Sequence, residues 1–344
     1  MNKIKIKVVG TGSYLPPNIV TNEQLSSVIE TNDEWIKTRT GISQRHIAGP
    51  DENTSDLATK ALQDALSHAN LTGSDLDAII VTTTTPDLIF PSVGVKVQQN
   101  VGMQNGFAFD IQTVCSGFVY ATYTAEKFLR SGDVKRVAVV GAETMSRILN
   151  WNDRSTCVLF GDGAGAVILE SYESDDPAGS DIIDVMLATN PSLQDALYAC
   201  DNNFMTKNSS MDKIAKFLQS KRESSPQEFG IHMNGAAVYK NAVEGMTDIS
   251  LKILERNKMS LSDVKWLLLH QANMRITKSI AERLQIAGNR VMESISECAN
   301  TSVATIPISL DKYVKNNPEL QRGDMILMAT AGAGMTFSSA LLRW

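Results

Sequence analysis

A cysteine, a histidine and an asparagine, each followed by a predicted helix, are the residues best placed for chemistry. Cys115 stands where the predicted strand 107–114 gives way to Ser116, Gly117 and a predicted helix over about 118–130. Unpaired N–H groups and the positive end of the helix dipole favour a thiolate there. Cys115 is therefore a candidate nucleophile, and the alternative is an interior cysteine that only packs.

His270 and Asn300 occupy comparable places later in the chain. His270 ends the apolar run 266–269 and leads into a predicted helix over 274–284. Strand ends of this kind are where open α/β sheets place ligand contacts. Asn300, like Cys115, is followed by a small hydroxyl residue and a predicted helix.

The elements that must position these residues alternate between short β-rich runs and longer helical patterns, which predicts an α/β fold with strands buried on both faces. The clearest helix is capped at residues 54–56, repeats apolar residues at helical spacing from Leu57 and ends near Asn70. A strand over 76–82 follows it.

Two sequence blocks recur along the chain. Residues 71–82 match residues 259–270 at an offset of 188, and residues 131–143 match residues 322–334 at an offset of 191. Because both blocks keep nearly one offset and one order, a duplicated α/β unit explains them better than chance similarity between buried strands.

We expect the duplicated halves to span about 1–175 and 176–344, each with its own sheet. Cys115 lies 33 residues after the matched strand end at residue 82, and Asn300 lies 30 residues after the matched strand end at residue 270. Duplication therefore predicts that both lie near a pseudo-twofold axis, with His270 beside them. Cys–His pairs perform acyl transfer through a thioester, and neutral His and Asn donors stabilise an enolate or oxyanion.

Composition excludes several classes of protein. The chain has 344 residues, 43% of them apolar, and a net charge of −6 without a block of Lys or Arg, so we expect no nucleic-acid partner. No apolar run is long enough to cross a bilayer, and we expect no membrane association and a cytoplasmic location. Four scattered cysteines fit neither a disulfide framework nor a zinc site.

The glycine-rich segments predict no nucleotide cofactor. Residues 161–165 (GDGAG) lack the Gly-Lys-Ser/Thr of a P-loop, and residues 10–12 lack the third glycine of a dinucleotide fingerprint. We expect no cofactor and no metal. Residues 332–334 (GAG) close a predicted strand, where a backbone N–H could approach the active site.

A polar excursion over about 189–229 breaks the α/β pattern. It is rich in Asn, Ser, Lys, Asp and Gln and holds a possible short helix around 211–220. Its polarity predicts a solvated surface segment without function of its own.

Seven short motifs are distributed in order along nearly the whole chain: Thr31–Ile36, Thr38–Ile42, Val114–Phe118, Gly161–Gly165, His270–Ile276, Asn300–Ser302 and Ser339–Trp344. Together they resemble the β-ketoacyl-acyl-carrier-protein synthase III family of condensing enzymes. The resemblance implies a thiolase-like fold, with two duplicated α/β halves in a five-layer α-β-α-β-α arrangement.

The resemblance also implies a reaction. A short acyl-CoA, most often acetyl-CoA, would acylate Cys115, and malonyl-acyl carrier protein would then lose CO₂ and attack the acyl-enzyme to initiate type II fatty acid synthesis. His270 and Asn300 would stabilise the enolate. The backbone N–H groups of Cys115 and Ala333 would form the oxyanion hole.

Further contacts follow from the same resemblance. Family members are homodimers, in which Phe90 would close the partner's acyl pocket. An acidic carrier protein needs local positive charge on a chain of net charge −6. The residues implied for binding fall into two sets: Trp35, Arg39, Arg154 and Asn273 for CoA, and Lys240, Arg275, Lys278 and Arg283 for acyl carrier protein.

The chain departs from the common family pattern in three places. These are the excursion over 189–229, Ala333 where many relatives have Gly, and Met335 with Phe337 where Phe and Trp are frequent. Ala333 keeps the backbone N–H that an oxyanion hole needs. The other changes are expected to border the entrance for primer and CoA.

Several alternatives remain open from sequence. A branched or dicarboxylic primer is one, as in a 3-oxopimeloyl synthase of biotin synthesis, and a dicarboxylic primer would need a cation such as Arg147. A Cys-His-Asn thiol hydrolase fits the duplicated architecture poorly. A degradative thiolase would need a second cysteine near Gly332, and a non-catalytic binding module would not need Cys115, His270 and Asn300 together.

Overall fold

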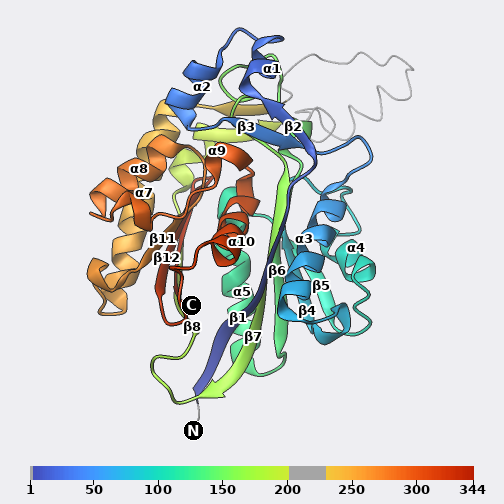
Figure 1. The fold of residues 1–344 in the computed structure, drawn as a ribbon, viewed down its shortest axis with the longest axis vertical. Coiled ribbons are helices and arrows are strands. Elements are labelled where there is room, and N and C mark those ends of the chain that lie inside the picture. The colour runs from blue at the N-terminus through green and yellow to red at the C-terminus, as the bar shows by residue number, and fades with distance from the viewer. Residues whose placement is uncertain (1–2, 201–229) are drawn as a thin grey trace.

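The first of two large sheets is built from the N-terminal part of the chain (Figure 1). The computed structural model describes residues 3–200 and 230–344. The strands of the first sheet are, in spatial order, β1 (Lys3–Tyr14), β7 (Gly163–Ser174), β6 (Arg136–Glu143), β4 (Ala78–Thr82) and β5 (Phe107–Ile111).

The second sheet repeats this order. Its strands are β8 (Asp181–Thr189), β13 (Thr336–Arg343), β12 (Met325–Gly332) and β11 (Trp266–Leu269). The β11–β12 pair is parallel like β4–β6, and the β12–β13 pair is antiparallel like β6–β7. A parallel bridge from Leu267 to Val291 stands where β5 pairs with β4 in the first sheet.

Helices separate and cover the two sheets, which gives five layers (Figure 1). One pair covers the outer face of the first sheet, one pair lies between the sheets, and one pair covers the outer face of the second sheet. In that order the pairs are α3 (Thr54–Ala69) with α4 (Val93–Asn100), α5 (Gly117–Ser131) with α10 (Thr305–Asn316), and α7 (Gly235–Arg256) with α8 (Met274–Arg283). The predicted α/β class and layered duplication are confirmed.

Smaller elements gather at the end of the molecule drawn at the top of Figure 1. They are α1 (Asn22–Ser26), α2 (Asp33–Thr40), α9 (Ile295–Cys298), the hairpin of β2 (Asn18–Thr21) with β3 (Gln44–Ile47), and the hairpin of β9 (Leu197–Cys200) with β10 (Gly230–Met233). The short helix predicted near 211–220 lies outside the described residues, between β9 and β10.

Three apolar cores hold the layers together. The central core lies between the sheets and includes Phe118, Trp266 and Val303, all buried. The two outer cores lie beneath α3 with α4 and beneath α7 with α8. Burial of apolar surface of this extent is the main driving force for such a layered fold.

The predicted elements near the site are confirmed. The helix expected to end near Asn70 is α3, which closes with Asn70 in the left-handed conformation at φ 54°. The helix expected over 118–130 is α5, and the one expected over 274–284 is α8.

The offset of 188 residues also relates backbone conformations that lie outside the matched sequence blocks. Left-handed backbone recurs at Asn70 and Lys258, both at φ 54°, and at Val114 and Ser302, at φ 47° and 51°. At this offset Cys115 corresponds to Val303, and Asn300 lies three residues earlier. This three-residue difference is the one that the spacings of 33 and 30 residues give in the sequence, so Asn300 lies close to the place of Cys115. We propose that the halves meet between β7 and β8, near residue 175.

The glycine-rich segment 161–165 packs against α10. A Cβ on Gly165 would lie 2.7 Å from the backbone N of Ile308 in α10, so only glycine permits this approach. Asp162 is buried, and its carboxylate accepts hydrogen bonds from the backbone N–H and the hydroxyl of Ser146 at 2.8 and 2.6 Å. The segment holds the two halves close together.

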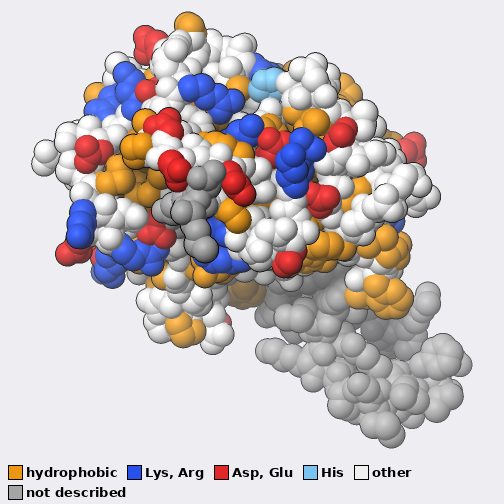
Figure 2. All heavy atoms as spheres, turned by 90° about the horizontal axis from the view of Figure 1, so that it is seen from below, with side chains coloured by type: hydrophobic (Ala, Val, Ile, Leu, Met, Phe, Trp, Pro, Cys, Tyr) orange, Lys and Arg blue, Asp and Glu red, His pale blue; other side chains and the backbone are white. Residues whose placement is uncertain are grey.

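The surface and interior hold few special features in the part of the chain that the structure describes. None of its helices combines the length and apolar character needed to span a membrane. Within 3–200 and 230–344, no group of three or more His, Cys, Asp or Glu side chains could hold a metal ion. On the face drawn in Figure 2, Lys and Arg side chains are interspersed with Asp and Glu.

Candidate active site

Cys115 lies in a short 3₁₀ turn, Val114–Ser116, directly before α5. Its side chain is buried, and its Sγ lies 3.6 Å from the hydroxyl oxygen of Ser302. Ser302 begins the corresponding turn before α10. The helix-starting turns of the two halves therefore meet at Cys115.

Glycines allow this meeting. A Cβ on Gly117 would lie 2.0 Å from Thr82 Oγ1 and 3.0 Å from a methyl carbon of Val303. A Cβ on Gly332, at the end of β12, would lie 3.0 Å from the backbone N of Ser116. Neither position has room for a side chain, so both glycines let backbone and helix ends approach the nucleophile.

Asn300 is fixed by backbone and side chain. Its N–H donates to the carbonyl of Leu159 at 3.0 Å, and its own carbonyl accepts from Gly161 N–H at 3.1 Å. Its side-chain Oδ1 accepts from the backbone N–H of Ser302 at 2.9 Å. Since Oδ1 is held in this way, the amide Nδ2 is the end of the buried side chain that remains to donate to a ligand.

His270 follows the carboxyl end of β11, and its backbone N–H donates to Ala329 at 3.0 Å. The imidazole is buried, and its Nδ1 lies 2.7 Å from the hydroxyl oxygen of Thr305, the first residue of α10. The same hydroxyl lies 3.1 Å from the carbonyl oxygen of Ser302.

One chain of contacts therefore joins the three predicted residues. Ser302 contacts Cys115 and Asn300, and Thr305 joins Ser302 to His270. Sequence reasoning missed Ser302 and Thr305. The only signal for Ser302 was its place in the hydroxyl pair Thr301-Ser302 after Asn300, which by type alone is equally suited to capping α10, and Thr305 had no signal of its own.

Burial controls the charge of the site. It raises the pKa of the Cys115 thiol to about 12, with nearby Glu143 adding to the shift and the Ser302 hydroxyl opposing it. It lowers the pKa of His270 to about 3. The thiolate expected from the helix N-terminus is thus not the resting form, because desolvation opposes it, and the pair is a neutral thiol with a neutral imidazole.

Ala333 lies in the turn between β12 and β13, beside the Gly332 that approaches Ser116. Its carbonyl is 3.5 Å from Thr336 Oγ1. No described residue accepts a hydrogen bond from the Ala333 N–H. That N–H is therefore free to donate to a bound ligand.

Trp35, Arg39 and Arg154 form a separate cluster at the end of the molecule that carries α2. The guanidinium of Arg39 lies 5.2 Å from the centre of the Trp35 ring, and that of Arg154 lies 5.0 Å from it. An aromatic ring flanked by two cations is suited to a planar, anionic ligand such as a nucleotide. Asn273 caps α8, and its Oδ1 accepts from Arg275 N–H at 2.9 Å.

Comparison with known proteins supports one family. Family models described as 3-Oxoacyl-[acyl-carrier-protein (ACP)] synthase III, and as its C-terminal part, match residues 109–191 and 254–344. Beta-ketoacyl-[acyl-carrier-protein] synthase III of Ehrlichia canis is 45% identical over 98% of both chains, and that of Bradyrhizobium diazoefficiens is 44% identical over 100% of both. The chain belongs to the β-ketoacyl-acyl-carrier-protein synthase III family.

Solved structures agree with this assignment. The 3-oxoacyl-[acyl-carrier-protein] synthase III of Aquifex aeolicus superimposes with a TM-score of 0.87 at 40% identity, covering 98% of this chain and 100% of that one. The enzyme of Thermus thermophilus gives a TM-score of 0.87 at 34% identity, covering 98% and 99%. The thiolase-like fold expected for this family is confirmed.

The cations that family resemblance assigned to carrier-protein binding lie on or beside the groove between α7 and α8. Lys240 and Arg283 line a hollow of about 230 Å³ there, together with Glu244 and Glu282. Arg275 lies over the Tyr239 ring at 5.9 Å. Lys278 is exposed on α8, so all four cations occupy one region, which also contains acidic side chains. The four cations are Lys240, Arg275, Lys278 and Arg283.

Phe90 is 82% exposed and stands beside Leu88 and Ile89, which are 50% and 72% exposed. These three adjacent apolar side chains form an exposed apolar patch. Phe107, on the edge strand β5, is also exposed.

The residues considered for primer choice have defined surroundings in the structure. Arg147 is exposed, and its guanidinium donates to Asn53 Oδ1 at 3.1 Å and to the carbonyl of Glu52, so it is not a free cation in a primer pocket. Met335 and Phe337 are buried in the outer core beneath α7, and the Phe337 ring fills the space beside Gly245.

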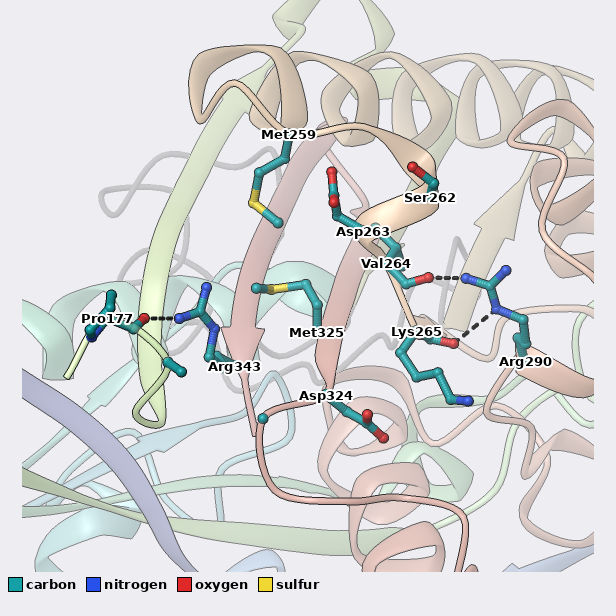
Figure 3. A pocket seen from close by; sticks show the side chains of 12 residues that line it. Pro177, Met259, Ser262, Asp263, Val264, Lys265, Arg290, Asp324, Met325 and Arg343 are labelled. Atoms are coloured by element: carbon teal, nitrogen blue, oxygen red, sulfur yellow. Dashed lines mark hydrogen bonds between the residues drawn. The ribbon is translucent and has the colours of Figure 1, made fainter.

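A larger hollow, of about 830 Å³, lies at the opposite end of the second sheet (Figure 3). It opens at the amino ends of β11 and β12, beside Lys265 and Met325, whereas His270 follows the carboxyl end of β11. Figure 3 shows Arg343 donating to the carbonyl of Pro177 and Arg290 donating to backbone carbonyls. These arginines join loops and are distant in the fold from the nucleophile.

The neutral Cys115 thiol makes a testable prediction. Because its pKa is raised to about 12, its rate of alkylation by iodoacetamide should rise about tenfold per pH unit from pH 7 to 9.5 without a plateau. The rate is measured by intact mass, with Cys115→Ser as the control for the other three cysteines. A plateau that begins below pH 8 would contradict the raised pKa.

Proposed function

We propose that the chain catalyses the decarboxylative condensation of a short acyl-CoA, most simply acetyl-CoA, with malonyl-acyl carrier protein through an acyl-Cys115 intermediate. The observation that carries this proposal is the junction of the two halves, where a buried thiol, a neutral imidazole and an amide donor are joined by Ser302 and Thr305. The family's own printed name describes the same reaction class.

In the first step Cys115 Sγ attacks the thioester carbonyl of the acyl-CoA. The thiol must lose its proton as the carbon–sulfur bond forms, because burial keeps it protonated at rest. The developing oxyanion accepts from the backbone N–H groups of Cys115 and Ala333. The bond to CoA breaks, and CoA leaves as its thiol with the proton that Cys115 gave up.

In the second step malonyl-acyl carrier protein replaces CoA. Its carbon–carbon bond to the carboxylate breaks and releases CO₂, and the electron pair passes into an enolate. The thioester oxygen of this enolate accepts hydrogen bonds from His270 and from Asn300 Nδ2. The enolate carbon attacks the acyl carbonyl, the bond to Cys115 breaks, and the leaving Cys115 thiolate takes up a proton from solvent.

The CoA contacts are part of the proposal. Trp35 and Arg154 would hold the adenine between them, Arg39 would pair with phosphate, and Asn273 would face the pantetheine arm. The present 5.0 Å between the Arg154 guanidinium and the Trp35 ring leaves no room for a base, since two stacked layers need about 7 Å. Arg154, whose partner is the carbonyl of Glu30, would have to swing outward.

Among primers, acetyl-CoA is the one we propose. A branched acyl-CoA is the alternative that a wider pocket would permit. The dicarboxylic alternative has less support, because Arg147 is exposed and its guanidinium is held by Asn53 Oδ1 and by the backbone carbonyl of Glu52. Membership of a condensing family disfavours the thiol hydrolase.

We also propose that the chain works as a homodimer in the cytoplasm, on cytoplasmic thioesters. The exposed residues Leu88, Ile89 and Phe90 lie in the loop that joins β4 to α4, and Phe107 lies on the open edge of the first sheet. Pairing of two β5 edges would cover this apolar surface and place Phe90 in the partner's acyl pocket.

The catalytic assignment is tested by intact mass after incubation with acetyl-CoA. Cys115→Ser should form no acetyl adduct. His270→Ala and Asn300→Ala should keep the adduct and lose decarboxylation of malonyl-acyl carrier protein by about 100-fold or more, because each removes an enolate donor. An adduct that persists in Cys115→Ser would overturn the nucleophile. Running the same assay with branched and dicarboxylic acyl-CoAs identifies the primer.

The carrier-protein surface is tested by charge reversal. Arg275→Glu should raise the KM for malonyl-acyl carrier protein about tenfold at low salt, leave the KM for acyl-CoA unchanged, and lose its effect as salt rises. The matched control is Lys252→Glu on α7, where Lys252 pairs with Asp248 away from the groove. Equal KM values for the two variants would count against this surface.

Dimerisation is tested by sedimentation. Phe107→Asp places a charge on the β5 edge and should weaken self-association at least about tenfold. Leu251→Asp, an equally exposed apolar position on α7, is the control and should sediment like the unmodified chain. A monomeric unmodified chain would refute the proposal.

A further inference from the structure

We infer that the Thr305 hydroxyl is a positioning residue that holds His270 in the tautomer with its proton on Nε2. This inference deepens the proposed function and rests on it for the role given to His270. Its basis is the buried 2.7 Å contact between Thr305 Oγ1 and His270 Nδ1.

The hydroxyl of Thr305 carries one proton and lies near two acceptors. The carbonyl of Ser302 is 3.1 Å away and already accepts the backbone N–H of Thr305. The imidazole Nδ1 is closer, at 2.7 Å, and is buried with no charge to compensate it. The proton is assigned to the bond with Nδ1, because that contact is the shorter one and because the Ser302 carbonyl already accepts from the Thr305 N–H. In the opposite arrangement an Nδ1–H would donate to the hydroxyl, and the hydroxyl would donate to Ser302.

A donor at Nδ1 determines what the other ring nitrogen does. When Nδ1 accepts a hydrogen bond, the neutral ring carries its proton on Nε2, which can then only donate. Burial lowers the pKa of His270 to about 3, so the ring does not gain a second proton near neutral pH. His270 is thus prepared to donate to an enolate oxygen, alongside Asn300 Nδ2, and not to take the proton of Cys115.

The duplication gives independent support. At the offset of 188, His270 corresponds to Thr82 and Thr305 corresponds to Gly117. These positions also meet in the first half, where a Cβ on Gly117 would lie 2.0 Å from Thr82 Oγ1. In the described part of the chain Thr82 Oγ1 has no hydrogen-bond partner. The same contact therefore exists twice, and a hydroxyl stands at the helix start only in the half that holds the histidine.

The experiment compares Thr305→Val, which removes the hydroxyl at nearly constant volume, with Thr305→Ser, which keeps it. Thr305→Val should lower decarboxylation and condensation about 10- to 100-fold, as loss of a residue supporting a catalytic group commonly does, and leave Cys115 acetylation within about twofold. Thr305→Ser should restore most of the activity. Thr122→Val in α5 is the matched control, because among the described residues the hydroxyl of Thr122 donates only to the carbonyl of Phe118 in its own helix.

The tautomer itself is read by nitrogen NMR of protein labelled with ¹⁵N-histidine, with the His270→Ala spectrum identifying the signal. We expect a protonated Nε2 and an unprotonated Nδ1 in the unmodified protein and in Thr305→Ser, and a loss of this preference in Thr305→Val. A protonated Nδ1 in the unmodified protein would overturn the inference. So would equal losses of acetylation and decarboxylation in Thr305→Val, which indicate a purely structural role.

The two proposals fail separately. If the unmodified protein condenses none of the acyl-CoAs tested, the proposed function fails, whereas the NMR spectrum still reports the bond between Thr305 and His270. If the protein condenses normally and the tautomer is the opposite one, only the role of Thr305 fails.

Discussion

The 3.6 Å contact between Cys115 Sγ and Ser302 Oγ is the point on which the arrangement of the site depends, because it is where the two halves of the molecule meet. Each partner sits in a turn that begins a central helix, and each turn contains a residue with left-handed backbone, Val114 or Ser302. Such a conformation is costly for a residue with a side chain and persists only where its surroundings enforce it. Here the surroundings are the opposite half.

Much of this could be predicted from sequence. The strands and helices that precede Cys115 and His270 follow from apolar periodicity, and the duplication follows from two matched blocks. The sequence leaves the correspondence between the turns open, because one matched block precedes them, the other follows them, and the two offsets of 188 and 191 differ by three residues. The register of the turns emerges only from their backbone, which pairs Cys115 with Val303. Similarly, Ser302 and Thr305 acquire importance through contacts made across the fold, which their residue types do not reveal.

The charge state of the site is the main point on which sequence and structure differ. A helix N-terminus favours a thiolate, and that reasoning considers only the helix. In the folded protein the thiol is buried against Ser302 with the buried Glu143 nearby, and desolvation raises its pKa. The same burial keeps His270 neutral. Such a site carries no resting charge on either group, so its donors are available for charge that develops during reaction.

Duplication also explains how one fold supports two different chemical tasks. Corresponding positions of the halves face each other across the junction, so a substitution in one half changes one side of the site only. The first half retains a glycine at 117 and supplies the thiol at 115, whereas the second half has a hydroxyl at Thr305, a histidine at 270 and valine where the thiol would be. In the mechanism that we propose, acyl acceptance and enolate stabilisation are therefore divided between the copies. Because α5 and α10 both contribute side chains to one central core, the turns that precede them are held by the same apolar packing.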